Sequence, residues 1–250
     1  MALNTVAGGI RGAIAFLTRL PIASGADDWE RFRAFPAAFP IVAYLVGALA
    51  ALPFVLGFPT PTAAFAYLAV LVALVGIPHL DGAADLGDAM AAHGAEETIQ
   101  ALKDTETGVG AIVAVVLVVS GLVLAGLTLS TLPLAAAVGL VVAAEVGAKL
   151  GMATVACLGT AAHEGLGSAF TESADSQLLL GPIIVALPAA FLAPLPAGLA
   201  AVAVGPLVAI LLIRWANRSI GGVNGDVFGA TNELARVLAL HVGVIAWTLW

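Results

Sequence analysis

Residues 108–144 read GVGAIVAVVLVVSGLVLAGLTLSTLPLAAAVGLVVAA, a run without a single charged side chain. A helix of roughly 20 apolar residues is enough to cross a lipid bilayer, so this run is too long for one crossing. The polar and proline-containing stretch Ser130–Pro133 interrupts it near the middle, where a turn is expected. The run therefore predicts a hairpin of two membrane-spanning helices.

Two further uncharged runs, residues 36–78 and 178–213, show the same pattern. Prolines interrupt them at Pro53–Pro61 and at Pro194–Pro196. The chain is 61% hydrophobic with a mean hydropathy of +1.08 and is only 10% charged, whereas soluble domains are about 25% charged. We predict an all-α polytopic membrane protein, one domain over residues 1–250, with about seven spans arranged as hairpins: 36–56, 62–78, 109–129, 134–158, 178–193, 197–215 and 228–250.

The N-terminal residues 6–19 are too short and too basic to span, because arginines lie within and at the end of the apolar stretch. Such a segment is typical of a helix that lies in the membrane interface. The net charge of −7 argues against a nucleic-acid partner, and the single Cys157 excludes a disulfide framework.

Hairpins return the chain to the side from which it left, so the segments 24–35, 79–107, 159–177 and 214–227 should emerge on one face. That face collects most of the basic residues, while the opposite turns carry none: Arg31, Arg33, Lys103, Arg214 and Arg218. The positive-inside rule predicts that this face is cytoplasmic.

The segment PHLDGAADLGD at residues 78–88 places three carboxylates on that face. In a helix Asp81, Asp85 and Asp88 lie at i, i+4 and i+7 and point the same way. Mg²⁺ is bound by carboxylates together with substrate phosphates, so the spacing predicts a magnesium site. The alternative is a solvated helix start with Asp81 as the N-cap.

Two neighbouring loops offer groups for phosphate and cation binding. Lys103 precedes a small-residue turn at a helix start, which suits a phosphate, although an ordinary capped loop has the same pattern. The segment 221–230 reads GGVNGDVFGA. There Gly222 and Gly225 allow close backbone approach to a ligand, and Asn224 and Asp226 supply oxygen ligands; the alternative is a turn with Asp226 as the N-cap of the last helix.

Ionisable residues also occur inside predicted spans, where they are functional candidates. Glu145 and Lys149 are spaced to pair with each other, and Glu233 and Arg236 are spaced in the same way. Of the histidines, we expect His241 to be packed against its neighbours or to lie at the membrane interface, and His93 to be a loop residue.

Five motifs in order along the chain resemble the cobalamin synthase family, whose members are membrane-bound adenosylcobinamide-GDP ribazoletransferases. They are Phe16–Pro21, His79–Asp88, Lys103–Thr105 with Gly108, Glu164–Phe170 and Gly221–Leu234. Thr105 and Asn224 depart from the residues most common at those places in the family.

The resemblance implies transfer between adenosylcobinamide-GDP and α-ribazole or α-ribazole 5′-phosphate, with release of GMP, by a multi-pass protein of the cell membrane. It implies a Mg²⁺ ion on Asp81, Asp85 and Asp88, phosphate neutralisation by Lys103, a further acidic group in Asp226 and proton acceptance by a carboxylate or His79. A homo-oligomer is compatible with the sequence. A CDP-alcohol phosphotransferase that makes a phospholipid and a small membrane transporter are the alternative functions.

Overall fold

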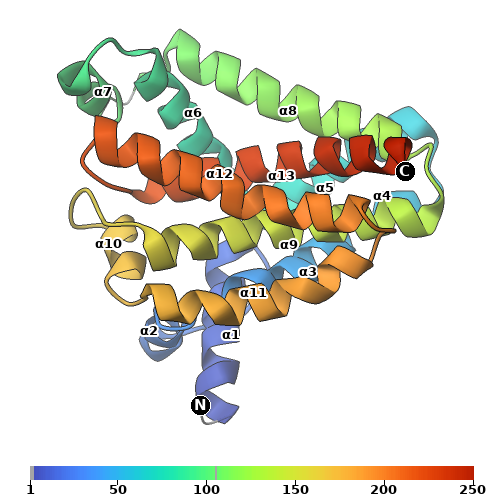
Figure 1. Ribbon diagram of the computed structural model, residues 1–250, viewed down its shortest axis with the longest axis horizontal. Coiled ribbons are helices and arrows are strands. Elements are labelled where there is room, and N and C mark those ends of the chain that lie inside the picture. The colour runs from blue at the N-terminus through green and yellow to red at the C-terminus, as the bar shows by residue number, and fades with distance from the viewer. Residues whose placement is uncertain (1–2, 105) are drawn as a thin grey trace.

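The computed structural model describes residues 3–104 and 106–250, and helices account for most of this part of the chain (Figure 1). The longer helices are α1 (Leu3–Leu17), α3 (Ala38–Ala50), α5 (Thr60–Val75), α6 (Pro78–Ala91), α8 (Val109–Leu129), α9 (Leu134–Leu158), α12 (Ala197–Ser219) and α13 (Gly225–Leu249). The shorter ones are α2 (Ala26–Arg33), α4 (Leu52–Val55), α7 (Ala95–Ala101), α10 (Leu166–Thr171), η1 (Ser176–Leu179), α11 (Leu180–Ala186) and η2 (Leu187–Phe191).

Within the described residues, four segments are long and apolar enough to cross a membrane: Ala38–Val55, α8, α9 and α12. The helices α5 and α6, bent by 98° relative to each other, would add a fifth if they form one span. This confirms the all-α polytopic membrane fold, but the predicted count of seven spans is not confirmed. Residues 176–191 form only short helices interrupted by prolines, and the charged residues of α13 reduce its apolar character.

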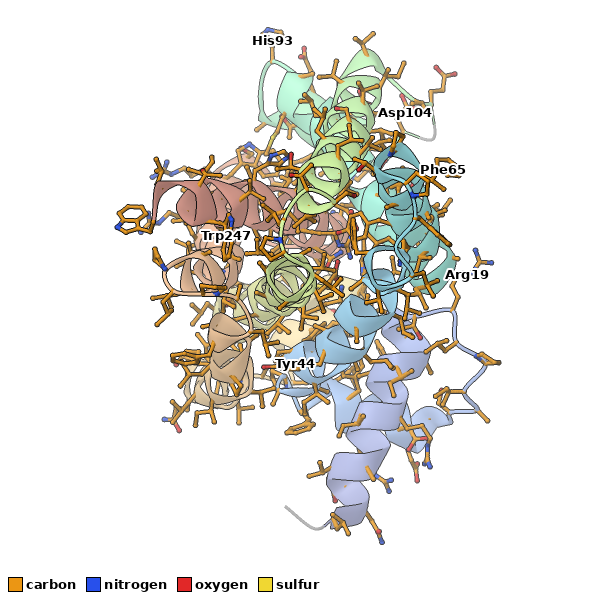
Figure 2. All side chains as sticks on the ribbon, turned by 90° about the vertical axis from the view of Figure 1, so that its right-hand side faces the viewer. Arg19, Tyr44, Phe65, His93, Asp104 and Trp247 are labelled. Atoms are coloured by element: carbon orange, nitrogen blue, oxygen red, sulfur yellow. The ribbon has the colours of Figure 1, made fainter. Side chains whose placement is uncertain are left out.

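Helix α9 lies at the centre of the bundle, as the view along the long helices shows (Figure 2). Its residues are mostly Ala, Gly and Val, and nearly all of them are buried. Gly147 and Gly151 face Gly205 of α12 so closely that a Cβ on any of the three would meet the backbone of the other helix. Small residues at such crossings let membrane helices pack tightly.

Helix α1 runs across the long helices rather than along them (Figure 1), as expected for an interfacial helix. It is held to α2 by Arg11, which donates two hydrogen bonds of 2.7 Å to the carboxylate of Asp28. This guanidinium lowers the pKa of Asp28. The ring of Phe16 adds contacts to Trp29 and Phe170, with centroid distances of 5.0 and 5.8 Å.

The polar connections lie together at one end of the bundle. In Figure 1, α7, α10 and the turn between α12 and α13 are at the left, whereas α4 and the C-terminus are at the right. The chain reaches this end through Gly76, which adopts φ 71°, and Pro78 then starts α6 in a new direction. The expectation that these loops share one face is therefore met by the helix arrangement.

Candidate active site

Helix α6 carries the three aspartates on one continuous helix, as the spacing predicts. Asp81 is exposed, and Asp85 and Asp88 are half-buried. The N-cap position is Ile77, since Pro78 is the first helical residue. Asp81 therefore lies in the first turn and is not the N-cap, which removes that alternative role.

A close crossing of α6 and α13 brings a fourth carboxylate to this site. A Cβ added to Gly82 would lie 2.9 Å from both the Cα and the carbonyl oxygen of Asp226, so only glycine permits this approach. Burial raises the pKa of Asp226 and the Asp81 carboxylate raises it further, while the hydrogen bond from Asn224 acts in the opposite direction. Burial raises the pKa of Asp85 to about 6, and the nearby carboxylates of Asp226, Asp81 and Asp88 contribute to the increase.

The Asp88 carboxylate has a structural role that the sequence did not predict. Its two oxygens accept hydrogen bonds from the backbone N–H groups of Gly108 and Ala111, at 2.8 and 2.9 Å. Gly108 is the N-cap residue of α8 and Ala111 lies in its first turn, where the N–H groups have no partner within the helix. Asp88 thus caps α8 from a neighbouring helix and fixes the end of the loop that carries Lys103.

The segment that precedes α13 is held by backbone pairing with the loop after α9. Val223 donates to the carbonyl of Thr160 at 2.8 Å, and Ala162 donates to the carbonyl of Val223 at 2.9 Å. A Cβ on Gly222 would overlap the Thr160 carbonyl oxygen, so Gly222 serves this loop contact. Asn224 is the N-cap of α13 and accepts from the N–H of Val227 at 3.1 Å.

The N-cap role suggested for Asp226 is therefore wrong, because Asn224 is the N-cap and α13 begins at Gly225. Asp226 lies instead in the first helical turn, where its carboxylate accepts a hydrogen bond of 2.7 Å from the Asn224 amide. A carboxylate in this position is favoured by the helix dipole.

A cavity of about 610 Å³ opens beside these groups. Four residues that the sequence predicted for the site line its polar wall: Lys103, Asn224, Gly225 and Asp226. His163, which was not predicted, lines it as well. Ile99, Leu102, Ala162 and Ile220 line the rest. His163 was given no role in the sequence because a lone loop histidine carries no spacing signal, and Thr105 lies outside the described residues.

None of Asp81, Asp85, Asp226 and Lys103 takes part in an ion pair within residues 3–104 and 106–250. In the same part of the chain, no three His, Cys, Asp or Glu side chains are close enough to hold a metal by themselves. Mg²⁺ needs only one or two carboxylates when substrate phosphates supply further oxygens. The donor set of unpaired carboxylates therefore fits a magnesium ion that binds together with a diphosphate.

Below this site a buried network joins α9 to α13. Arg236 donates to both oxygens of Glu145 and, at 2.5 Å, to Glu233. The ammonium group of Lys149 donates to the Asn232 side-chain oxygen at 2.5 Å. The predicted Glu145–Lys149 pair is therefore wrong, since Arg236 reaches Glu145 from the neighbouring helix, whereas the Glu233–Arg236 pair is confirmed.

The network ends at His79, which lies in the first turn of α6, the helix that carries the three aspartates. The Asn232 side-chain nitrogen lies 3.2 Å from His79 Nδ1 and 2.9 Å from Glu233 Oε1. Because the Asn232 oxygen faces Lys149, its nitrogen is the donor toward the imidazole. His241 is packed as expected, with Nε2 3.0 Å from the carbonyl of Gly121, and His93 points away from the protein body (Figure 2).

Comparison with known proteins identifies the family of the chain. The family model of cobalamin-5-phosphate synthase matches residues 9–244. A protein of Halorubrum lacusprofundi named adenosylcobinamide-GDP ribazoletransferase is 50% identical over 251 residues, which cover 96% of this chain and 97% of that protein.

Two further relatives bear the same name. The one from Haloquadratum walsbyi is 42% identical, with 96% of this chain and 98% of that protein covered. The one from Methanocella arvoryzae is 35% identical, with 97% and 96% covered. No solved structure matches the chain. The family match and the full-length relatives together show that the chain belongs to the cobalamin-5-phosphate synthase family.

Proposed function

We propose that this protein joins adenosylcobinamide-GDP to α-ribazole, or to α-ribazole 5′-phosphate, and releases GMP. The product is adenosylcobalamin or its 5′-phosphate. The observation that carries this proposal is the position of Asp226, which lines one cavity with Lys103 and also lies near Asp81 and Asp85. The full-length relatives of this chain bear the name of that transferase.

The carboxylates of Asp81 and Asp85, with Asp226 opposite them, are the groups that would hold Mg²⁺. When bound, the ion supplies charge neutralisation at the diphosphate. Asp88 supports the same site from behind, because its carboxylate holds the first turn of α8. This gives the three aspartates of α6 two different roles, binding for the first two and positioning for the third.

Lys103 and the first turn of α13 are placed to bind phosphate oxygens. Lys103 is exposed to the 610 Å³ cavity and has no acidic partner among the described residues. Gly225 presents its backbone to the same cavity, and Asn224 fixes that backbone by capping α13. A lysine and a helix N-terminus together form an anion-binding site.

In the transfer step, a ribazole hydroxyl oxygen forms a bond to the phosphorus that is attached to cobinamide. The bond from that phosphorus to the bridging oxygen breaks, and GMP leaves with this oxygen. One of the carboxylates of this site accepts the hydroxyl proton in this proposal. His79 is not the acceptor, because Asn232 donates to Nδ1 of the imidazole and Nε2 then carries the proton of the neutral ring.

We place this site on the cytoplasmic face of the cell membrane, with the apolar helices in the lipid bilayer. Lys103 lies in the connection after α7, Arg214 and Arg218 lie near the end of α12, and α2 adds Arg31 and Arg33. The positive-inside rule favours this orientation. Cysteine introduced in the 159–165 loop should react with a membrane-impermeant thiol reagent only in inverted vesicles; reaction in intact cells would reverse the assigned topology.

The test of function uses membranes that contain the protein, supplied with adenosylcobinamide-GDP and α-ribazole 5′-phosphate with and without Mg²⁺. We expect GMP and the corrinoid product in equal amounts, and only with Mg²⁺. Asp81→Ala and Asp85→Ala should abolish turnover, whereas Asp27→Ala, at an exposed carboxylate of α2, should not. Normal turnover after chelation would refute the metal assignment, and nucleotide release from a CDP-alcohol instead would refute the substrate.

A further inference from the structure

A second, smaller cavity lies on the other side of Gly225. Its volume is about 150 Å³, and Gly225 lines both this cavity and the 610 Å³ cavity. His79 lines the smaller cavity as well. Whatever occupies it therefore lies next to His79 and beside the first turn of α13.

The walls of the smaller cavity are aromatic and aliphatic. Five helices contribute to them, through Phe16, Val75, Met152, Leu166, Phe170 and Phe228. The ring centroid of Phe170 lies 5.8 Å from that of Phe16 and 5.5 Å from that of Phe228, so the aromatic rings of this wall pack against one another. His79 is the only titratable side chain among the described residues that line the cavity.

These features select the chemical class of the occupant. The cavity lacks the charged groups that a phosphate needs, and such groups line the larger cavity. Drug-sized ligands need roughly 300 Å³ or more, whereas an apolar cavity of roughly 150 Å³ holds a single small aromatic molecule. Of the parts of the two substrates, the benzimidazole base of ribazole is small, flat and uncharged.

We infer that the 150 Å³ cavity binds the aromatic base of ribazole, and that Leu166, Met152 and Phe228 determine which bases fit. The inference rests on the proposed function for the identity of the substrate. With the base in this cavity, the attached ribose extends past Gly225, and its hydroxyl groups come between His79 and the acidic residues. The rings of Phe170 and Phe228 then provide stacking or edge contacts to the base.

The test measures binding of the free base 5,6-dimethylbenzimidazole to the purified protein in detergent micelles by equilibrium dialysis, with empty micelles as the blank. The two methyl groups should improve affinity by about tenfold over unsubstituted benzimidazole if both are buried. Leu166→Trp should weaken binding by at least about tenfold, because the larger ring fills the cavity mouth. Leu178→Trp is the matched control, since Leu178 has 37% exposure against 38% for Leu166 and lines neither cavity.

Leu166→Ala provides a second variant whose effect does not depend on the side-chain conformation that an introduced tryptophan adopts. It should reduce the preference for the dimethylated base, because it removes part of the wall. Equal binding by wild type, Leu166→Trp and Leu166→Ala, or no binding above the micelle blank, would overturn the inference.

Base binding and turnover report separately on the two proposals. The Asp81→Ala variant should still bind the free base, because the acidic residues do not line the smaller cavity. Base binding with the expected variant pattern but without transfer would leave the binding site in place and refute the proposed function. Transfer with an unchanged KM for ribazole in Leu166→Trp would refute the binding site and leave the function intact.

Discussion

Replacement of Asp88 separates its capping role from direct cation binding. The Asp88 oxygens accept one N–H each from Gly108 and Ala111, at 2.8 and 2.9 Å, and the side chain is half-buried. Asp88→Ala removes both bonds and the negative charge from the start of α8. Loss of a cap costs about 0.5–2 kcal/mol and loss of the dipole interaction costs about 0.3–1 kcal/mol. The free energy of unfolding should therefore fall by about 1–3 kcal/mol.

Asp88→Asn keeps one carbonyl oxygen as an acceptor, so it should lose less than the alanine variant. One lost hydrogen bond costs about 0.5–1.5 kcal/mol. If Asp88 acts by holding α8, this variant should keep transferase activity to within about tenfold of wild type, the factor that corresponds to one lost hydrogen bond. Loss of a direct cation ligand should instead nearly abolish activity. Asp81→Asn should be far more damaging, with little change in stability, because Asp81 is exposed.

The assay combines denaturation in mixed detergent micelles with GMP release from adenosylcobinamide-GDP. Asp175→Asn is the control, because Asp175 also accepts two backbone N–H groups, at the start of η1 and away from the 610 Å³ cavity. The reasoning is refuted if Asp88→Asn unfolds like wild type but loses activity as fully as Asp81→Asn. Asp88 would then bind the cation directly, as the sequence spacing alone predicts.

Three further predictions follow from other contacts. Arg236→Met should lower the free energy of unfolding in mixed micelles by about 3–5 kcal/mol, because it leaves buried carboxylates unpaired. Adding Glu145→Gln to the same chain should recover part of this loss, whereas additive losses from the two changes would contradict the pairing of Arg236 with Glu145. Gly222→Ala should lower both stability and turnover, since its Cβ overlaps the backbone of residue 160, and wild-type values for both would disprove the close approach. The pKa of Asp28 is lowered by its hydrogen bonds to Arg11, so the packing of α1 on α2 should be stable above pH about 4 and weaken as the pH falls below it. Arg11→Met should flatten this pH dependence in a proteolysis assay of the N-terminal segment. An unchanged pH profile would exclude the Arg11–Asp28 pair as its cause.

The sequence by itself predicted the helical membrane fold and the gathering of polar loops at one end. Both depend on local properties, namely uncharged runs long enough to span and breakers at their midpoints. The aspartates of α6 were also readable, because positions i, i+4 and i+7 share a helix face wherever that helix lies. The number of spans was not readable, since Pro182, Pro188 and the charged residues of α13 change how long apolar segments behave.

Only the tertiary structure decided which partners the polar groups have. Glu145 could pair with Lys149 by its spacing, yet α13 places Arg236 beside it. Asp88 could bind a cation by its spacing, yet the first turn of α8 presents two N–H groups to it. The physical reason is that sequence spacing fixes which side chains are neighbours within one helix, whereas packing between helices fixes which donors and acceptors meet. Inside a membrane no water is available to satisfy a buried polar group, so these partners must come from the protein.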